Sequence, residues 1–300
     1  MRVLVTGSSG QVGGALSTVL APLGTILAAD RSNFDLATPD ALPRQLDRFA
    51  PDIIINPAAY TAVDRAEDEP ELAMRVNAKS PGVMAQWATA HSIPLIHFST
   101  DYVFSGAGDH AWREDDATGP LSIYGSSKLA GEKEILAAGG CSLIVRTSWV
   151  YAAKGRNFLR TIARLALQRN DLRIVADQIG SPTSARILAD VVALMIAEGI
   201  DVLRARVAQA QGLVHVCAAG EASWHRFATE IVDGLRFRGV KLAVARVVPI
   251  CSDELPTRAK RPLNSRLDLG RLHELFGVRT PHWEQGLEAE LDQLAPELLA

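Results

Sequence analysis

Residues 1–20 read MRVLVTGSSGQVGGALSTVL, and this stretch decides the expected fold. An apolar run of strand length over residues 1–6 leads into a glycine-rich turn, and apolar residues at helical spacing follow the turn. A strand, a glycine turn and a helix start, in that order, are typical of a dinucleotide-binding βαβ unit. The stretch therefore predicts a parallel α/β sheet with a phosphate site at the start of the first helix.

The three glycines of this turn have different expected tasks. Gly7 permits the tight turn, Gly10 lets the backbone approach a pyrophosphate, and Gly13 lets the helix pack closely on the strand. Their spacing is G-x-x-G-x-x-G rather than the commoner G-x-G-x-x-G, so the prediction depends on the strand before the turn and the helix after it. The N–H groups at the helix start and its positive dipole end would then face the phosphates.

Asp30 and Arg31 end the second apolar segment, residues 25–29, and bear on the choice of cofactor. An acidic residue about 20 positions past the glycines is placed to bond the adenosine ribose hydroxyls, which favours NAD. A neighbouring guanidinium can accept the 2′-phosphate of NADP. The pair therefore leaves both NADH and NADPH open, and the two side chains could also simply lie in solvent at a strand end.

Short apolar segments alternate with helical ones up to about residue 150. The predicted strands are residues 25–29, 52–56, 93–98 and 142–146, and the predicted helices are residues 70–77, 80–91 and 127–138. The alternation predicts a doubly wound parallel sheet, a Rossmann-like α/β fold, in a dinucleotide-binding domain of residues 1–150.

After Trp149 the rhythm changes, and residues 151–300 are expected to form a smaller α/β domain that binds mainly substrate. Strands near residues 172–176 and 213–217 could complete the first sheet. The Pro- and Arg-rich residues 252–268 are expected to form a loop over the site. Ligands of such folds bind outside the carboxyl ends of the strands.

Tyr124 and Lys128 lie four residues apart in Tyr-Gly-Ser-Ser-Lys, about one helical turn, so they share one face of a helix. A free tyrosine titrates near pH ~10, and a fixed cation within ~4–6 Å lowers that pKa toward neutrality. Such a pair suits general acid or base catalysis. The alternative is an exposed helix on which the tyrosine ring packs against the lysine stem.

Several longer stretches carry a family resemblance from one end of the chain to the other. They are TGSSGQVG at residues 6–13, the segment of residues 56–67, FSTDYVF at 98–104, YGSSKLAGE at 124–132, RTSWVY at 146–151, residues 177–183 and RPLNSRL at 261–267. In these the chain resembles the extended short-chain dehydrogenase/reductases, and among them most closely the dTDP-4-dehydrorhamnose reductases. The resemblance implies NADPH or NADH as cofactor. It also implies reduction of the C4 keto group of dTDP-4-dehydro-L-rhamnose, a step of dTDP-rhamnose and cell-surface polysaccharide synthesis.

The resemblance also implies residue roles. Tyr124 would donate the proton at sugar C4, Lys128 would hold the nicotinamide ribose and lower the tyrosine pKa, and Thr100 would bond the carbonyl or the tyrosine hydroxyl. The cofactor would further contact Gly7, Gly10, Gln11, Val12, Gly13, Asp30, Arg31, Asp35, Leu36, Ala58, Ala59, Tyr60 and Phe98. The sugar nucleotide would contact Thr100, Asp101, Tyr124, Trp149 and Arg261.

The basic run Arg258, Lys260, Arg261 and Arg266 would ordinarily be a solvated face. In a chain that holds a nucleotide sugar diphosphate, a phosphate contact is the functional alternative, because arginine matches phosphate bidentately.

Two positions depart from the family pattern. Ala15 stands where some relatives carry an acidic residue that helps to hold magnesium between subunits, which argues against Mg²⁺ here without excluding it. Tyr60 stands where relatives often have histidine, a change that could alter cofactor preference. A homodimer is compatible with the resemblance.

Composition excludes several classes of protein. A net charge of −3 gives no reason to expect nucleic acid or an anionic membrane as partner. No apolar run reaches ~18 residues, and no signal peptide is expected, because Met1-Arg2 runs straight into an apolar strand and a glycine turn. Cys141, Cys217 and Cys251 form no C-x-x-C pair, so reduced thiols, a cytoplasmic location and no metal centre are expected.

Other interpretations remain beside this one. His97 lies inside an apolar strand and is expected to be a satisfied core histidine rather than a base. Ser99 and Ser148 lack the G-x-S-x-G elbow of a hydrolase. The rival functions are a reductase or epimerase of another nucleotide sugar and a non-catalytic, dinucleotide-binding regulatory subunit. The intact catalytic set argues against the regulatory subunit.

Overall fold

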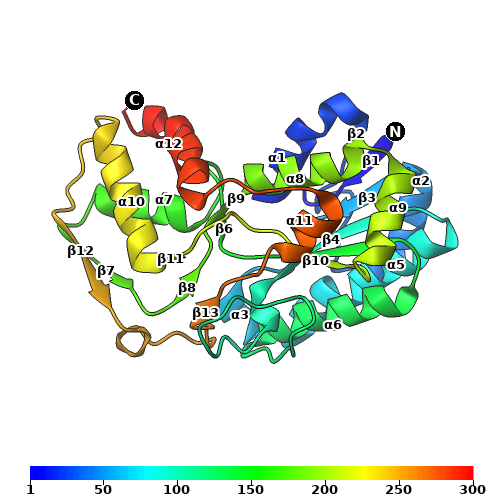
Figure 1. Cartoon of the computed structure of the whole chain (residues 1–300), viewed down its shortest axis with the longest axis horizontal. Coiled ribbons are helices and arrows are strands. Elements are labelled where there is room, and N and C mark those ends of the chain that lie inside the picture. The colour runs from blue at the N-terminus through cyan, green and yellow to red at the C-terminus, as the bar shows by residue number, and fades with distance from the viewer. Residues whose placement is uncertain (300) are drawn as a thin grey trace.

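The computed structural model describes residues 1–299, and a six-stranded parallel sheet forms its centre (Figure 1). The strands lie in the order β10-β5-β4-β3-β1-β2, and every neighbouring pair is parallel. Their bounds are β1 Arg2–Val5, β2 Thr25–Ala28, β3 Ile53–Asn56, β4 Leu95–Thr100, β5 Ser142–Thr147 and β10 Leu213–His215. The predicted Rossmann-like α/β class is confirmed.

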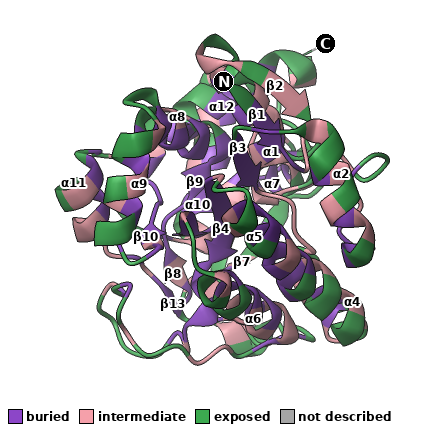
Figure 2. Cartoon of the chain, turned by 90° about the vertical axis from the view of Figure 1, so that its right-hand side faces the viewer, coloured by how far each residue is buried: buried purple, intermediate pink, exposed green. Residues whose placement is uncertain are grey.

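Helices cover both faces of this sheet, because alternate residues of the strands point to opposite sides. Val3 and Val5 pack in one core cluster with Leu16 and Leu188, which come from α1 (Gln11–Val19) and α8 (Ala185–Ala197). Leu4 packs in a second cluster with residues of α2 (Leu42–Phe49) and α5 (Ser80–Ala90). Figure 2 shows the strands as a buried centre between helices whose outer faces are exposed.

The helix α6 (Ile123–Ala138) runs beside α5 and begins four residues earlier than predicted. The stretch predicted as two helices over residues 70–77 and 80–91 is continuous. It consists of α4 (Pro70–Met74), a π-helical turn η3 (Arg75–Lys79) and α5. The short helix α3 (Val63–Ala66) precedes it, and a 3-10 turn η4 (Asp101–Val103) follows β4.

A second group of elements lies beside the sheet and contains the helices α7 (Phe158–Ala166), α10 (Trp224–Phe237) and α12 (Trp283–Leu299) (Figure 1). Three small sheets join it: β7 (Asp171–Val175) with β12 (Arg246–Ile250), β6 (Val150–Tyr151) with β9 (Thr183–Ser184), and β8 (Ile179–Gly180) between β11 (Ala222–Ser223) and β13 (Asn264–Ser265). Residues 252–268 are mostly irregular, as predicted, apart from the 3-10 turn Ser252–Glu254 and β13.

Only one of the two late strands joins the main sheet. The strand predicted near residues 213–217 does so as β10, beside β5. The strand predicted near residues 172–176 does not, because β7 pairs only with β12. Exposed Asp171 and Arg173 alternate with buried Leu172 along β7, a one-sided pattern that does not suit a strand covered on both faces.

Helices from beyond residue 150 also pack with the N-terminal half. They are α8, which packs on α1, α9 (Ile200–Gln209), which packs on α8, and α11 (Gly270–Phe276), which packs on β10 of the main sheet and on α9. A domain boundary near residue 150 therefore stays a prediction. Within residues 1–299, no helix combines the length and the apolar character needed to cross a membrane.

Candidate active site

The glycine turn between β1 and α1 has the geometry expected of it. Gly7 has a φ of +54°, and the Gly10 N–H donates to the Gly7 carbonyl at 2.8 Å. A Cβ on Gly13 would lie 2.1 Å from the Gly7 oxygen, so only glycine allows α1 to approach the turn this closely. No side chain of the described residues caps the start of α1. Its N–H groups are free for an anionic ligand.

Gln11 is the first residue of α1, and the second half of the chain holds its side chain. Asn157 donates its Nδ2 hydrogen to Gln11 Oε1 at 2.8 Å. Val12, the next residue, is half-buried against the core beneath the turn. The pyrophosphate contact of these residues stays a prediction, and its donors would be backbone N–H groups.

Asp30 follows β2 and organises its own turn. Its Oδ1 accepts hydrogen bonds from the Ser32 backbone N–H at 2.8 Å and from the Ser32 hydroxyl at 2.6 Å. These bonds hold the pKa of Asp30 below its usual value. Arg31 is exposed. The carboxyl oxygen Oδ2 is the atom through which Asp30 would meet a ribose.

Asp35 and Leu36 follow on the same side of the sheet. The Ala37 N–H donates to Asp35 Oδ1 at 2.9 Å, and the Ser80 hydroxyl donates to the Leu36 carbonyl at 2.6 Å. Leu36 itself is buried in the core cluster on the α2 and α5 side. The first bond is local to the loop after β2, and the second ties that loop to the start of α5.

The loop after β3 carries Ala58, Ala59 and Tyr60, all half-buried, and a residue that sequence reasoning missed holds it in place. Asn77, in the π-helical turn η3, accepts from the Tyr60 N–H at 2.8 Å and donates to the Tyr60 carbonyl at 3.0 Å. Asn77 also donates to the Ser127 hydroxyl of α6 at 3.0 Å. The sequence contains no usable signal for this role, because Asn77 is the last residue of the predicted helix 70–77, where an asparagine is ordinary, and its complete burial is visible only in the fold.

The helix α6 presents Tyr124 and Lys128 on adjacent turns, as predicted. Its start is fixed by Ser122, whose hydroxyl accepts from the Gly125 N–H at 3.2 Å, and by Glu67, which accepts from the Ile123 N–H at 2.8 Å. A Cβ on Gly125 would lie 2.2 Å from the Tyr102 carbonyl oxygen. Glycine after the tyrosine therefore lets α6 approach the end of β4.

Thr100 and Asp101 lie at that end of β4, next to Tyr124. The Thr100 hydroxyl contacts Asp101 Oδ1 at 3.1 Å, and burial raises the pKa of Asp101 to about 7. Asp101 Oδ2 is buried and has no hydrogen-bond partner among the described residues. The Ser265 hydroxyl interacts with this carboxyl without reaching hydrogen-bonding geometry. A buried acceptor that lacks a donor is a plausible ligand contact.

The expectation that Lys128 lowers the pKa of Tyr124 is not met. Burial raises the pKa of Tyr124 to about 12, hydrogen bonding with Thr100 lowers it in part, and the charge of Asp101 raises it. Lys128 is not among the groups that shift the pKa of Tyr124. Its Nζ donates to the Phe98 carbonyl at 2.6 Å and lies 3.1 Å from His97 Nε2.

Trp149 lies between β5 and β6 and adopts the left-handed region, with a φ of +49°. Its ring stacks on Trp224 with the centroids 3.6 Å apart, and its edge packs on Gly180. The side chain is buried, so one face of the ring is already covered within the protein. The substrate contact of Trp149 stays a prediction.

Arg261 is engaged by a carboxylate. Its Nη1 and Nη2 donate to the two oxygens of Asp64 at 3.0 and 2.7 Å, and Nη1 also donates to the Ala259 carbonyl at 3.0 Å. Arg258 pairs with Asp68 and Arg266 with Glu221. Three of the four basic residues at 258–266 thus form ion pairs. The segment is therefore not a free basic patch. Arg258 and Arg261 tie it to α3 and the turn after α3, and Arg266 ties it to the residue before β11.

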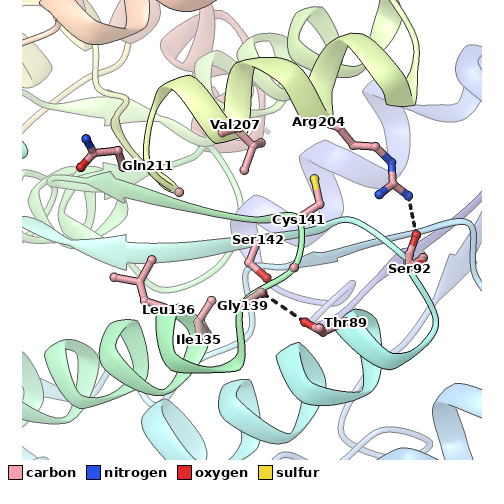
Figure 3. A pocket seen from close by; sticks show the side chains of 13 residues that line it. Thr89, Ser92, Ile135, Leu136, Gly139, Cys141, Ser142, Arg204, Val207 and Gln211 are labelled. Atoms are coloured by element: carbon pink, nitrogen blue, oxygen red, sulfur yellow. Dashed lines mark hydrogen bonds between the residues drawn. The ribbon is translucent and has the colours of Figure 1, made fainter.

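A cavity of about 440 Å³ lies at the opposite end of the sheet, near the starts of β4 and β5 (Figure 3). Cys141, Ser142, Leu136, Arg204 and Gln211 are among its lining residues, and the Arg204 guanidinium donates to the Ser92 carbonyl. No predicted site residue lines it. Within residues 1–299, no group of three His, Cys, Asp or Glu side chains is arranged to hold a metal ion.

Comparisons with known proteins agree with this geometry. The profile of the RmlD substrate binding domain matches residues 1–295. The dTDP-4-dehydrorhamnose reductase of Burkholderia thailandensis is 44% identical over 287 residues, covering 94% of this chain and 95% of the relative. The crystal structure of a dTDP-4-dehydrorhamnose reductase from Clostridium acetobutylicum superposes with a TM-score of 0.87 at 33% identity, covering 98% of this chain and 99% of that one.

A second solved structure is the dTDP-4-dehydrorhamnose reductase of Bacillus anthracis in complex with NADP. It has a TM-score of 0.84 at 33% identity and covers 97% of this chain and 99% of that one. The similarity therefore spans both halves of the chain, and the resemblance inferred from the sequence is confirmed. The chain belongs to the RmlD substrate binding domain family, and its similar full-length relatives are named as dTDP-4-dehydrorhamnose reductases, one of them solved in complex with NADP.

Proposed function

We propose that the chain reduces the C4 keto group of dTDP-4-dehydro-L-rhamnose with NADPH or NADH, and that Tyr124 donates the proton. The observation that carries the proposal is the convergence of Thr100, Asp101, Tyr124 and Lys128 at the end of β4, which lies next to β3, the strand that leads into the Ala58–Tyr60 loop. The full-length relatives named for this reaction supply the substrate.

The residues of the site fit a dinucleotide. The bare start of α1 and the close glycine turn offer backbone N–H groups to a pyrophosphate, and Asp30 Oδ2 remains for a ribose hydroxyl. When bound, a nicotinamide cofactor supplies the hydride. Asp101 Oδ2, buried and without a protein donor, would accept a hydrogen bond from a sugar hydroxyl.

Tyr124 suits a proton donor because its phenol remains protonated at neutral pH. With a pKa of about 12 it does not ionise by itself, yet it can give its proton to a developing alkoxide, which is a stronger base. Thr100, which favours the ionised phenol and lowers its pKa in part, would stabilise the phenolate after transfer. Lys128 would bond the nicotinamide ribose with a donor that Phe98 and His97 leave free.

The test is a panel of dTDP-, GDP- and UDP-4-keto sugars with both reduced cofactors, run on the parent and on Tyr124→Phe. The variant should lose a factor of roughly 10²–10⁴ in kcat while cofactor binding stays within a few-fold, because only the acidic proton is removed. Tyr151→Phe is the matched control: its buried hydroxyl has no partner among the described residues. Near-parent turnover of Tyr124→Phe would refute the role of the tyrosine.

The same panel decides between the alternatives. Preference for a GDP- or UDP-sugar would indicate another nucleotide-sugar reductase, and no turnover with tight cofactor binding would indicate a regulatory subunit. The choice between NADH and NADPH, a homodimer and a cytoplasmic location stay predictions.

A further inference from the structure

A buried chain of polar side chains runs behind the candidate site and ends on Lys128. The Thr6 hydroxyl lies 2.5 Å from Asn56 Oδ1, Asn56 Nδ2 lies 2.8 Å from His97 Nδ1, and His97 Nε2 lies 3.1 Å from Lys128 Nζ. All four side chains are at most 1% exposed. Thr6 directly follows β1, Asn56 is the last residue of β3, and His97 and Lys128 lie within β4 and α6.

Sheet register explains how this chain forms. Asn56 and His97 are direct partners in the parallel pairing of β3 with β4, so their side chains stand on the same face of the sheet. That face is covered by α6, one turn of which brings Lys128 over His97. His97 is thus a satisfied core histidine, as expected, but one of its two partners is the candidate catalytic lysine.

Counting protons on the imidazole shows why this contact matters. A neutral imidazole carries one N–H donor and one acceptor nitrogen. If Nδ1 accepts from the Asn56 amide, the N–H at Nε2 faces Lys128, and only an uncharged amine can accept it. If Nδ1 instead donates to the Asn56 oxygen, Nε2 accepts from Lys128, and the lysine can be an ammonium. The ring tautomer, the orientation of the Asn56 amide and the charge of Lys128 must therefore change together.

We propose that His97 is a positioning residue for Lys128. His97 Nε2 holds the lysine amino group, and the contact of His97 with Asn56 couples the His97 tautomer to the charge of Lys128. The proposal rests on the catalytic role proposed for Lys128. In this hydrogen-bonded network Lys128 can be either an ammonium or an uncharged amine, and the charge of a cofactor or substrate near Nζ would select between the two forms.

The groups that face Lys128 support two accessible charge states. Burial lowers the pKa of Lys128 to about 8, and Glu132, one turn further along α6, raises it. Glu132 is itself paired with Arg146 of β5. Burial, and then the charge of Lys128, hold the pKa of His97 well below its usual value, so the ring stays neutral and must choose one tautomer.

The experiment uses the full chain with NADPH bound and compares Asn56→Asp, His97→Leu and His97→Gln. An aspartate at 56 accepts only, so it selects the tautomer that receives the ammonium. The part of the pH–rate profile that reports the titration of Lys128 should then shift to higher pH by on the order of one unit. His97→Leu should move it down and lower kcat at pH 7 roughly tenfold, and His97→Gln, with an amide near the Nε2 position, should recover most of that loss.

His215→Gln is the matched control, because His215 is another fully buried strand histidine, located on β10 next to Phe104. It should leave the pH–rate profile unchanged. Profiles of Asn56→Asp and His97→Leu that superpose on the parent would overturn the proposal. If His97→Leu fails to fold, Asn56→Asp and the spectra described next still decide.

Nitrogen-15 spectra of the histidine rings test the coupling without any turnover. The His97 tautomer should switch over the pH range in which Lys128 titrates in the parent, and it should no longer switch in Lys128→Met. A single tautomer at all pH values in the parent would overturn the proposal. If no nucleotide sugar is reduced but the tautomer still switches, the proposed function fails while the coupling of His97 to Lys128 remains.

Discussion

Replacing Glu132 by glutamine should destabilise the protein more than any exposed charge change. Glu132 Oε1 accepts from Arg146 Nε at 2.9 Å and from the Ser99 hydroxyl at 2.5 Å, and Oε2 accepts from Arg146 Nη2 at 2.7 Å. The two side chains of the ion pair are only 3% and 4% exposed. A glutamine oxygen can replace Oε1, but its NH₂ group would face Nη2, so two donors oppose each other and the guanidinium stays charged and buried.

Breaking a buried ion pair from one side costs about 3–5 kcal/mol. At roughly 2 °C per kcal/mol for a chain of this size, the thermal midpoint should fall by about 6–10 °C. The remaining partners of Arg146, the Glu114 carbonyl at 3.3 Å and the face of Phe104 at 5.0 Å, are too weak to offset this cost.

The assay is thermal unfolding by circular dichroism at a fixed scan rate. Asp171→Asn is the control, because Arg246 donates through Nε and Nη2 to the two oxygens of Asp171 in the same way, but these side chains are 70% and 38% exposed, and the loss of this pair should barely move the midpoint. Replacing both partners, Glu132→Gln with Arg146→Met, should recover part of the loss. A midpoint for Glu132→Gln no lower than that of the control would refute the reasoning.

Three further outcomes concern the site. Lys128→Met should lower kcat and weaken NADPH binding, and the pH dependence near pH 8 should vanish from the rate profile; unchanged cofactor affinity would contradict the ribose contact. Arg31→Ala should lower kcat/KM with NADPH but not with NADH. In the parent enzyme, the kcat/KM values with the two cofactors should differ by less than ~2 kcal/mol in activation free energy. Equal losses with both cofactors would show that Arg31 faces elsewhere. Arg261→Ala should weaken dTDP binding in calorimetry, whereas Asp64→Asn should strengthen it by releasing the guanidinium; unchanged binding in both would make the pair purely structural.

The glycine turn, the Tyr124–Lys128 helix and the alternation of strands with helices could be predicted from the sequence. Each is a local pattern: a positive φ at Gly7, a four-residue spacing and an apolar period are properties of neighbouring residues. Thr100 and Asp101 were also identified as candidates, in their case through the family resemblance of residues 98–104. Their chemistry was therefore accessible before their positions were known.

Tertiary structure decided which of these residues are free to act. Only the fold shows that Arg261 is bound by Asp64, 197 positions away, and that β7 pairs with β12 instead of the main sheet. Only the fold brings Asn77 between the Tyr60 loop and α6, and His97 under Lys128. The pKa of Tyr124 rises because the phenol is buried. Burial is set by contacts between residues far apart in the sequence, so the four-residue spacing of Tyr124 and Lys128 could not predict it.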